Sequence, residues 1–170
     1  MAETRKIGEK GVGIVLQALR QRRPPQNMLT LNRQNDRRAG YDIELVARQT
    51  ITDEDWSSRF LEVKSDRHDN GNFFIEIFSQ SESNRLGGFI NTPAHYLMYL
   101  FLKTRRLHIF HVPDLQRWIR QNWRRFPYNP VRTPTGDTCF TTTGIVVPTY
   151  ELEHLDMNIE SFYDHVLDSF

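Results

Sequence analysis

The sequence predicts an α/β domain built on a mixed β-sheet of four to five strands flanked by helices. Two observations predict it. Apolar residues recur at helical spacing near the N-terminus and again after residue 113, and several short runs between these segments alternate apolar and polar residues, as half-buried strands do. At 170 residues the chain is long enough to bury a core of its own, so residues 1–170 are expected to form a single domain.

A first helix is expected over residues 5–20, where apolar residues recur near helical spacing. Pro24 and Pro25 would end this helix, because proline cannot donate the hydrogen bond that continues it. Three glycines near the start of the helix lack the spacing of a dinucleotide- or phosphate-binding loop, and no strand precedes them, so no nucleotide cofactor is expected. The recurring apolar residues are Ile7, Val12, Val15, Leu16 and Leu19.

Three strands are expected over residues 41–46, 59–64 and 73–78. The intervening tetrapeptide at residues 69–72, Asp-Asn-Gly-Asn, is typical of a turn between two strands. Residues 41–79 are therefore expected to form a three-stranded antiparallel meander.

The second half of the chain continues with helices and strands. Thr92 and Pro93 have the composition of a helix start, so a largely buried helix is expected over residues 94–101. A fourth strand over residues 107–112 precedes a helix that begins at Pro113. Later elements are expected to be a proline-punctuated loop at 127–136, a short strand at 144–149 and a final helix from Ile159.

Composition excludes several classes of protein. A single cysteine, Cys139, excludes a disulfide framework or a Cys-rich zinc site, and it is expected to be a buried thiol. The histidines do not have zinc-binding spacing and are expected on the surface or on helix faces. The longest apolar run, residues 95–102, is too short to cross a bilayer, and no export leader is visible. A cytoplasmic location without membrane contact is expected.

Charge is segregated along the chain although the net charge is +1. Residues 1–40 hold nine Lys or Arg against three Asp or Glu, whereas residues 135–170 hold seven acidic residues and no Lys or Arg. Arginines also come in pairs, and the guanidinium fork matches phosphate oxygens, which favours a nucleic-acid partner. Trp123, beside the last of these pairs, could touch a base or sugar. The arginines assigned to nucleic-acid binding are Arg22, Arg23, Arg37, Arg38, Arg124 and Arg125.

The residues with the clearest chemical potential are Asp42, Glu62 and Lys64. Glu62 and Lys64 are two apart in an expected strand and so share a face, which Asp42 reaches if the first two strands of the meander pair. Two carboxylates with water are what Mg²⁺ prefers, and a lysine beside them can orient a water or offset charge on a reacting phosphate. Glu-x-Lys also occurs on exposed strand faces with no function. The bulky apolar neighbours of these acidic residues favour the functional interpretation.

With Asp42 followed, after nineteen residues, by Glu62-Val63-Lys64, the sequence resembles the PD-(D/E)xK nuclease superfamily and its restriction-endonuclease-like fold. Tyr41 stands where that motif has a proline. The resemblance covers a motif core at residues 5–112, which leaves 113–170 as a basic helix and an acidic extension. Small Holliday-junction resolvases of phages and archaea are similar in size and layout.

The resemblance implies a role for each motif residue. Asp42 and Glu62 would bind Mg²⁺, for which Mn²⁺ can substitute, and the Val63 carbonyl would be a third ligand. Lys64 would position the attacking water. Glu9, on the leading helix, would hold a second metal or a metal-bound water.

The expected function is therefore a metal-dependent endonuclease that hydrolyses DNA phosphodiester bonds. No sequence-reading module is visible, so selectivity for junctions or branched DNA is preferred. Gln80, just after the third expected strand, could touch the scissile region. A homodimer is expected, because 170 residues are too few to enclose a duplex. Three alternatives remain open: a sequence-specific restriction-type endonuclease, a non-catalytic nucleic-acid-binding or assembly subunit of the same fold, and a protein-interaction module whose acidic tail docks a basic partner.

Overall fold

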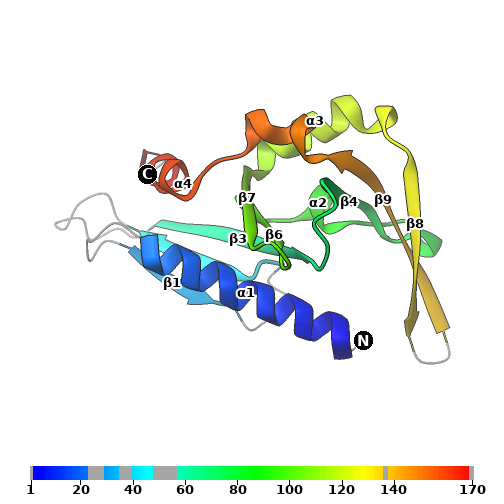
Figure 1. The fold of residues 1–170 in the computed structure, drawn as a ribbon, viewed down its shortest axis with the longest axis horizontal. Helices are drawn as coiled ribbons and strands as arrows, with labels where there is room; N and C mark the ends of the chain where they lie inside the picture. The colour runs from blue at the N-terminus through cyan, green and yellow to red at the C-terminus, as the bar shows by residue number, and fades with distance from the viewer. Residues whose placement is uncertain (1, 23–28, 35–39, 48–56, 136–137, 169–170) are drawn as a thin grey trace.

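The computed structural model describes residues 2–22, 29–34, 40–47, 57–135 and 138–168 (Figure 1). Its helices are α1 (Ala2–Arg22), α2 (Gly88–Asn91), α3 (Val112–Asn122) and α4 (Ile159–Asp168), with 3₁₀ turns η2 (Ser81–Ser83), η3 (Trp123–Arg125) and η4 (Thr149–Leu155). Its strands are β1 (Leu29–Arg33), β2 (Ile43–Ala47), β3 (Ser57–Asp66), β4 (Asn72–Gln80), β5 (Arg85–Leu86), β6 (Tyr96–Phe101), β7 (Arg106–His111), β8 (Tyr128–Thr135) and β9 (Thr138–Pro148).

Within these residues the strands form two sheets. The first has five strands in the order β1-β2-β3-β6-β7, and it is mixed, because β3 and β6 are parallel while the other neighbours are antiparallel. The second has four strands in the order β5-β4-β9-β8 and is antiparallel. The predicted α/β class, with a mixed sheet flanked by helices, is confirmed by the first sheet. The second sheet was not predicted.

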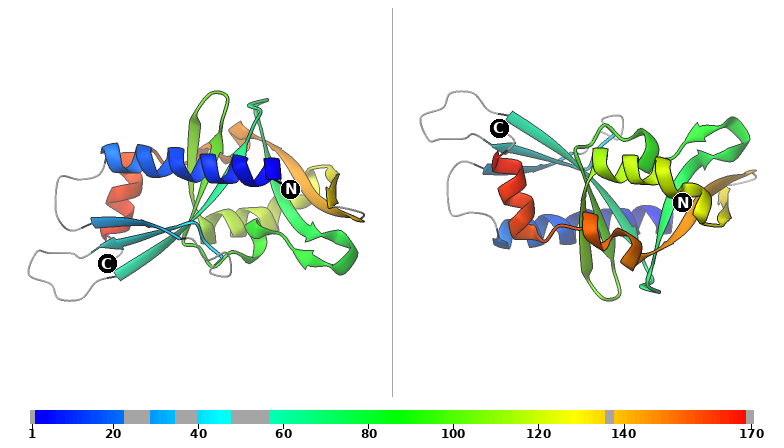
Figure 2. Two further views of the ribbon diagram at one scale, coloured as in Figure 1. Left: turned by 90° about the horizontal axis from the view of Figure 1, so that it is seen from below. Right: turned by 90° about the horizontal axis from the view of Figure 1, so that it is seen from above.

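Two hydrophobic cores lie on opposite faces of the first sheet. The first core joins that sheet to α1 and α4, and the second joins it to α3 and the second sheet. Figures 1 and 2 show α1 running along one side of the first sheet while α3 lies on the other. Strand β6 serves both cores, since its six residues are all buried and alternate between them.

The predicted helix over residues 94–101 is wrong, because this segment is β6. Its six consecutive apolar residues have no polar face, as is usual for a central strand covered on both sides. Thr92 does not cap a following helix but ends the four-residue helix α2. The prediction failed because a short apolar run has the same composition in a buried helix and in a buried strand.

The predicted meander over residues 41–79 is wrong in its third strand. A turn does follow β3 and lead into β4, but β4 pairs with β5 and β9 in the second sheet rather than with β3. The edge of β3 that a meander would use is taken by β6, which pairs with it in parallel. The chain thus leaves the first sheet after β3 and returns to it at β6.

The region expected to be a proline-punctuated loop at residues 127–136 contains strand β8. Pro130 and Pro134 are tolerated because β8 is the outermost strand of its sheet, where a missing N–H leaves no partner unsatisfied. The strand expected at residues 144–149 also begins earlier, since β9 spans Thr138–Pro148.

Two single-residue expectations are wrong. Cys139, expected to be buried, is exposed on β9. His108, expected on the surface, is packed among aromatic rings of the second core, and its Nδ1 lies 2.6 Å from Asp156 Oδ2. No helix among the described residues is long and apolar enough to cross a membrane.

Candidate functional site

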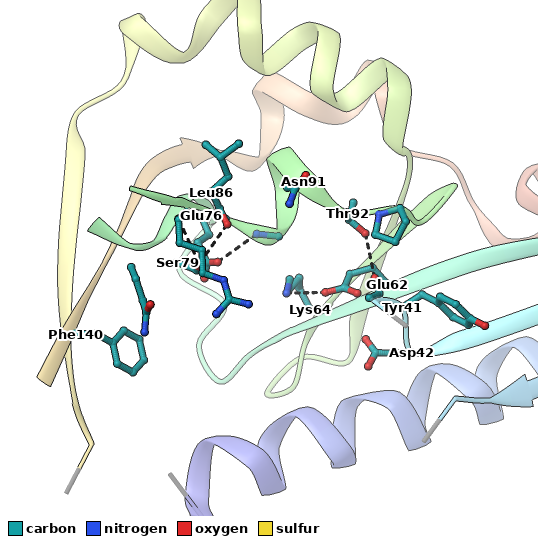
Figure 3. Close-up of a pocket in the computed structure, with 16 residues that line it drawn as sticks. Tyr41, Asp42, Glu62, Lys64, Glu76, Ser79, Leu86, Asn91, Thr92 and Phe140 are labelled. Carbon is teal, nitrogen blue, oxygen red and sulfur yellow. Dashed lines mark hydrogen bonds and ion pairs between the residues drawn. The ribbon is translucent and has the colours of Figure 1, made fainter. Parts of the chain in front are cut away.

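A pocket of about 480 Å³ opens where the end of the first sheet meets β4, β5 and α2 (Figure 3). Three of its lining side chains are carboxylates, and they come from three different strand regions. We call it the acidic pocket. Its charged and amide-bearing lining residues include Asp42, Glu62, Lys64, Glu76, Gln80 and Arg85.

Glu62 and Lys64 reach the pocket because β3 alternates between its two faces. Leu61 and Val63 point into the first core, which places Glu62 and Lys64 on the opposite face. Lys64 Nζ lies 2.7 Å from Glu62 Oε1, and the two side chains are only 32% and 14% exposed. This partly buried ion pair differs from a solvated surface pair, because water screens it much less.

Asp42 joins this pair from the residue before β2. Its backbone N–H donates to the Leu61 carbonyl at 2.9 Å, which extends the β2–β3 pairing by one position. Its Oδ2 accepts a hydrogen bond of 2.8 Å from the backbone N–H of Val63. The carboxylate of Asp42 is therefore fixed against the backbone between Glu62 and Lys64.

Glu76, on β4, is a third carboxylate of the pocket, and sequence reasoning missed it. Its Oε1 accepts a 3.2 Å hydrogen bond from the backbone N–H of Gly88. Its sequence signal is the same as that of Asp42, an acidic residue in an otherwise apolar strand. It was overlooked because β4 was placed in the wrong sheet, so nothing brought Glu76 near Glu62.

The charges of the pocket shift both members of the central ion pair. Burial raises the pKa of Glu62 above its ordinary value, and Lys64 only partly offsets that effect, while Asp42 and Glu76 add to it. Burial alone would lower the pKa of Lys64, but the surrounding carboxylates outweigh it and the pKa is raised. Lys64 therefore stays protonated, and the pocket has more carboxylates than ammonium groups to balance them.

Gly87 and Gly88 let the backbone approach the pocket side chains closely. A Cβ atom on Gly87 would lie 2.3 Å from the Glu76 carbonyl oxygen, so no other residue fits there without backbone movement. A Cβ atom on Gly88 would lie 3.0 Å from Lys64 Nζ. The two glycines thus hold the start of α2 directly against the Glu62–Lys64 pair.

The donors of the acidic pocket suit a hard divalent cation. Within the described parts of the chain, no three His, Cys, Asp or Glu side chains gather closely enough to hold a metal by themselves. A cation here would have the carboxylates of Asp42 and Glu62 and water as ligands, whereas Val63, whose carbonyl the resemblance implies as a third ligand, is not among the residues that line the pocket. Mg²⁺ commonly takes one or two carboxylates and keeps several waters, so this all-oxygen set fits it.

Other residues assigned from the sequence lie elsewhere. Gln80 lines the acidic pocket. Glu9 is exposed on α1 and is not among the residues that line this pocket. The structure therefore does not place Glu9 in the pocket with Asp42 and Glu62, where the resemblance would put a second metal.

The described arginines among those assigned to nucleic acid, Arg22, Arg124 and Arg125, are not among the residues that line the acidic pocket. Arg22 lies at the end of α1 and is 3.6 Å from Glu160, whereas Arg125 is 3.0 Å from Glu151. Arg124 lies over the ring of Trp123. The acidic partners of Arg22 and Arg125, Glu160 and Glu151, both belong to the acidic C-terminal segment of the same chain. Arg23, Arg37 and Arg38 lie outside the described residues.

Comparison with known proteins gives two matches. The model of the family described as Protein NO VEIN, C-terminal, matches residues 11–87, which is under half of the chain. The match includes Asp42, Glu62, Lys64 and Glu76, while other lining residues such as Asn91 and Phe140 lie outside it. A solved structure described as D212, a nuclease from a fusselovirus, is 12% identical, covers 97% of this chain and 96% of its own, and has a TM-score of 0.47. Likeness at that level does not carry function from one protein to another. No curated protein matches.

Proposed function

We propose that this protein is a metal-dependent nuclease of the PD-(D/E)xK type, which hydrolyses DNA phosphodiester bonds at the acidic pocket. The observation that carries the proposal is the convergence of Asp42, Glu62 and Lys64. Two coupled carboxylates and an ammonium group, from adjacent strand regions, line one partly buried pocket. A merely structural Glu–Lys pair has no need of Asp42 and Glu76 beside it, because added carboxylates make its burial less favourable.

In the proposed reaction, residues of this chain bind the metal ion, orient the water and neutralise charge on the phosphate. The carboxylates of Asp42 and Glu62 and the carbonyl of Val63 would hold Mg²⁺ or Mn²⁺, which would supply an activated water and stabilise charge on the phosphate. Lys64, kept protonated by its neighbours, would donate a hydrogen bond to the water or to a phosphate oxygen. Gln80 and Arg85 line the same pocket and offer further donors to a phosphate backbone.

We propose branched DNA as the substrate and a homodimer as the active form. One chain offers the acidic pocket once, and cutting two strands of a junction takes two such sites. Light scattering of the purified protein, alone and with a four-way junction, measures the mass of the complex. A complex of one chain per junction would contradict the dimer and leave the nuclease proposal standing.

A cleavage assay tests the central proposal. The substrates are supercoiled plasmid, linear duplex, single strand, flap and four-way junction, each with Mg²⁺, Mn²⁺ or EDTA. We expect cleavage that requires metal and falls by about 100-fold or more in Glu62→Gln, because a metal ligand is lost. Glu153→Gln is the matched control, since Glu153 is an exposed acid remote from the pocket lining.

Two results would overturn the proposal. Full activity in Glu62→Gln would reject the acidic pocket as the catalytic site. Binding of DNA without cleavage of any substrate, in either metal, would instead support a non-catalytic nucleic-acid-binding subunit.

A further inference from the structure

A second, apolar pocket of about 290 Å³ lies next to the acidic pocket. Leu86 lines both pockets, so the two are neighbours across the segment that carries β5 and α2. We call this second site the aromatic pocket. It is formed between β4, β5, α2, α3, η3 and the start of β8, and its lining includes Leu86, Ile90, Arg120, Trp123 and Tyr128.

The aromatic pocket keeps large apolar side chains partly open to solvent. Tyr128 is 51% exposed and Leu86 46% exposed, which sets them apart from the buried aromatic residues of the second core. The rings of Trp123 and Tyr128 have centroids 5.8 Å apart and planes inclined by 55°. Trp123 packs in part against the second core, whereas the exposed ring of Tyr128 is not explained by core packing.

Two arginines lie at this pocket or against its rings. Arg120 lines the aromatic pocket, and the Arg124 guanidinium lies 5.0 Å from the centre of the Trp123 ring. Among the described residues, no acidic side chain lines this pocket, in contrast to the acidic pocket beside it. Aromatic rings with arginines and no carboxylate suit a flat ring system attached to a phosphate, which is the chemistry of a nucleotide.

We propose that the aromatic pocket binds one unpaired nucleobase of the strand whose phosphodiester occupies the acidic pocket. This inference rests on the proposed nuclease function and narrows its substrate to branched DNA that offers a single-stranded or frayed segment. A base inside a duplex is stacked on both faces and cannot enter, whereas an unpaired base can lie against Tyr128 or Trp123. The volume of the pocket is at the small end of ligand pockets, which span about 300–1,000 Å³, and so suits one base rather than a base pair.

Fluorescence of 2-aminopurine tests this binding directly. A single-stranded oligonucleotide carrying 2-aminopurine is titrated with the full chain in EDTA, where no cleavage occurs, and the same label is placed in a duplex. We expect binding to quench the single-stranded label further than the duplex label. Tyr128→Ala should weaken single-strand binding by about tenfold, because stacking on one ring is lost. Tyr128 is half exposed at the start of an edge strand, so this variant is expected to fold.

Two further variants make the test specific. Tyr150→Ala removes an aromatic ring that is 66% exposed but lines neither pocket, and it should bind like the wild type. Arg120→Gln keeps a shorter polar side chain while removing the positive charge, and it should weaken binding and reduce the slope of affinity against salt.

The outcomes separate this inference from the proposed function. Quenching that is lost in Tyr128→Ala, in a protein that cleaves nothing, supports the base pocket and rejects the nuclease. Metal-dependent cleavage with single-strand binding unchanged in Tyr128→Ala rejects the base pocket and leaves the nuclease standing. A wild-type protein that binds the duplex as tightly as the single strand, with no extra quenching, also overturns the base pocket.

Discussion

At the scale of single residues, the acidic pocket is controlled by how three carboxylates share one ammonium group. Glu62 has a raised pKa because it is buried and faces Asp42 and Glu76, so in the folded state it binds a proton more readily than in the unfolded chain. Folding stability therefore falls as the pH rises from 4.5, the ordinary pKa of this carboxyl group, through the raised pKa that Glu62 has in the folded state. Burial of the ionised Glu62 carboxylate is the main cost to stability, and the charges of Asp42 and Glu76 add to it.

Glu76→Gln is expected to relieve this effect. Gln keeps an oxygen that can accept from the Gly88 N–H but removes a negative charge, so the pKa values of Glu62 and Lys64 should both fall. NMR titration of the Glu carboxyl carbons and of the Lys side-chain signals measures both values. Unchanged pKa values in Glu76→Gln would show that the charge of Glu76 does not reach the pair, whereas Glu153→Gln should leave both pKa values as they are.

The residues of the site differ in how far the sequence could predict them. Glu62 and Lys64 lie on one face because of a spacing of two, and Asp42 joins them through a pairing of neighbouring strands, so local patterns are sufficient. Glu76 and Arg85 arrive from a different sheet through long-range contacts. No pattern within a short window contains that information.

At the scale of elements, α1 lies close to β3 because Gly11 has no side chain. A Cβ atom at Gly11 would lie 1.7 Å from Ser65 Oγ and 2.9 Å from Ser65 Cβ. Gly11 is buried, whereas a Cβ atom at Gly8 would meet nothing within 4 Å. The same helix thus contains one glycine that packing requires and another that it does not.

Gly11→Ala and Gly8→Ala should consequently have opposite effects on stability. We expect Gly11→Ala to lower the free energy of unfolding by about 1–3 kcal/mol, because the added methyl forces α1 and Ser65 apart. Gly8→Ala should raise it by about 0.5–1 kcal/mol, since alanine favours the helix and meets open space. Urea unfolding followed by circular dichroism measures both. Equal effects would show that the contact between α1 and β3 is not tight at Gly11.

Asp69 links the turn after β3 to the turn between β6 and β7. Its carboxylate accepts hydrogen bonds from Thr104 Oγ1 at 2.7 Å and from Arg106 at 2.9 Å. The hydrogen bond from Thr104 is the main reason that the pKa of Asp69 is lowered, and Gly71 and Arg106 add to it. The ionised carboxylate therefore favours the folded state.

Asp69→Asn should make stability less sensitive to acid. A lowered folded pKa gives stability that is present above the ordinary value of 3.8 and is lost as the pH falls through the folded value. The variant cannot lose that contribution, so its stability should change less than that of the wild type below pH 3.8. Unfolding in urea at a series of acidic pH values measures this. If the free energies of unfolding of the two proteins changed equally with pH, ionised Asp69 would not contribute to stability as expected.

Element assignment from the sequence succeeded where one face is polar. The alternation of β2 and β3 and the amphipathic pattern of α3 are visible locally, and these elements are where they were expected. It failed for β6 because burial on both faces removes the alternation, and for β8 because proline normally ends a strand. In both cases the deciding factor is the place of the strand within its sheet.

At the scale of the whole molecule, β6 lies between the two cores and is paired on both edges, with β3 and with β7. Its backbone is covered by α1 and α4 on one side and by α3 and the second sheet on the other. Local opening of β6 would expose both cores together. Its hydrogen bonds should therefore break only when the whole structure unfolds.

Hydrogen exchange provides the measurement. We expect the amides of Leu97, Met98 and Leu100 to be among the slowest to exchange, with protection close to the global free energy of unfolding. Amides of β8, the outermost strand of the second sheet, should exchange sooner. Early exchange in β6 would mean that the two cores open independently.

The position of β8 also affects how copies of this protein meet. A proline cannot donate to β9, so Pro130, Arg132 and Pro134, which alternate along β8, direct their backbone groups away from β9. Tyr128 has the same parity, so of the four outward positions only Tyr128 and Arg132 have an N–H to offer to an approaching strand. Growth of the second sheet from one molecule into the next is therefore hindered at this edge, which guards against fibre-like aggregation. Two copies that come together on a nucleic acid would have to associate through some other surface.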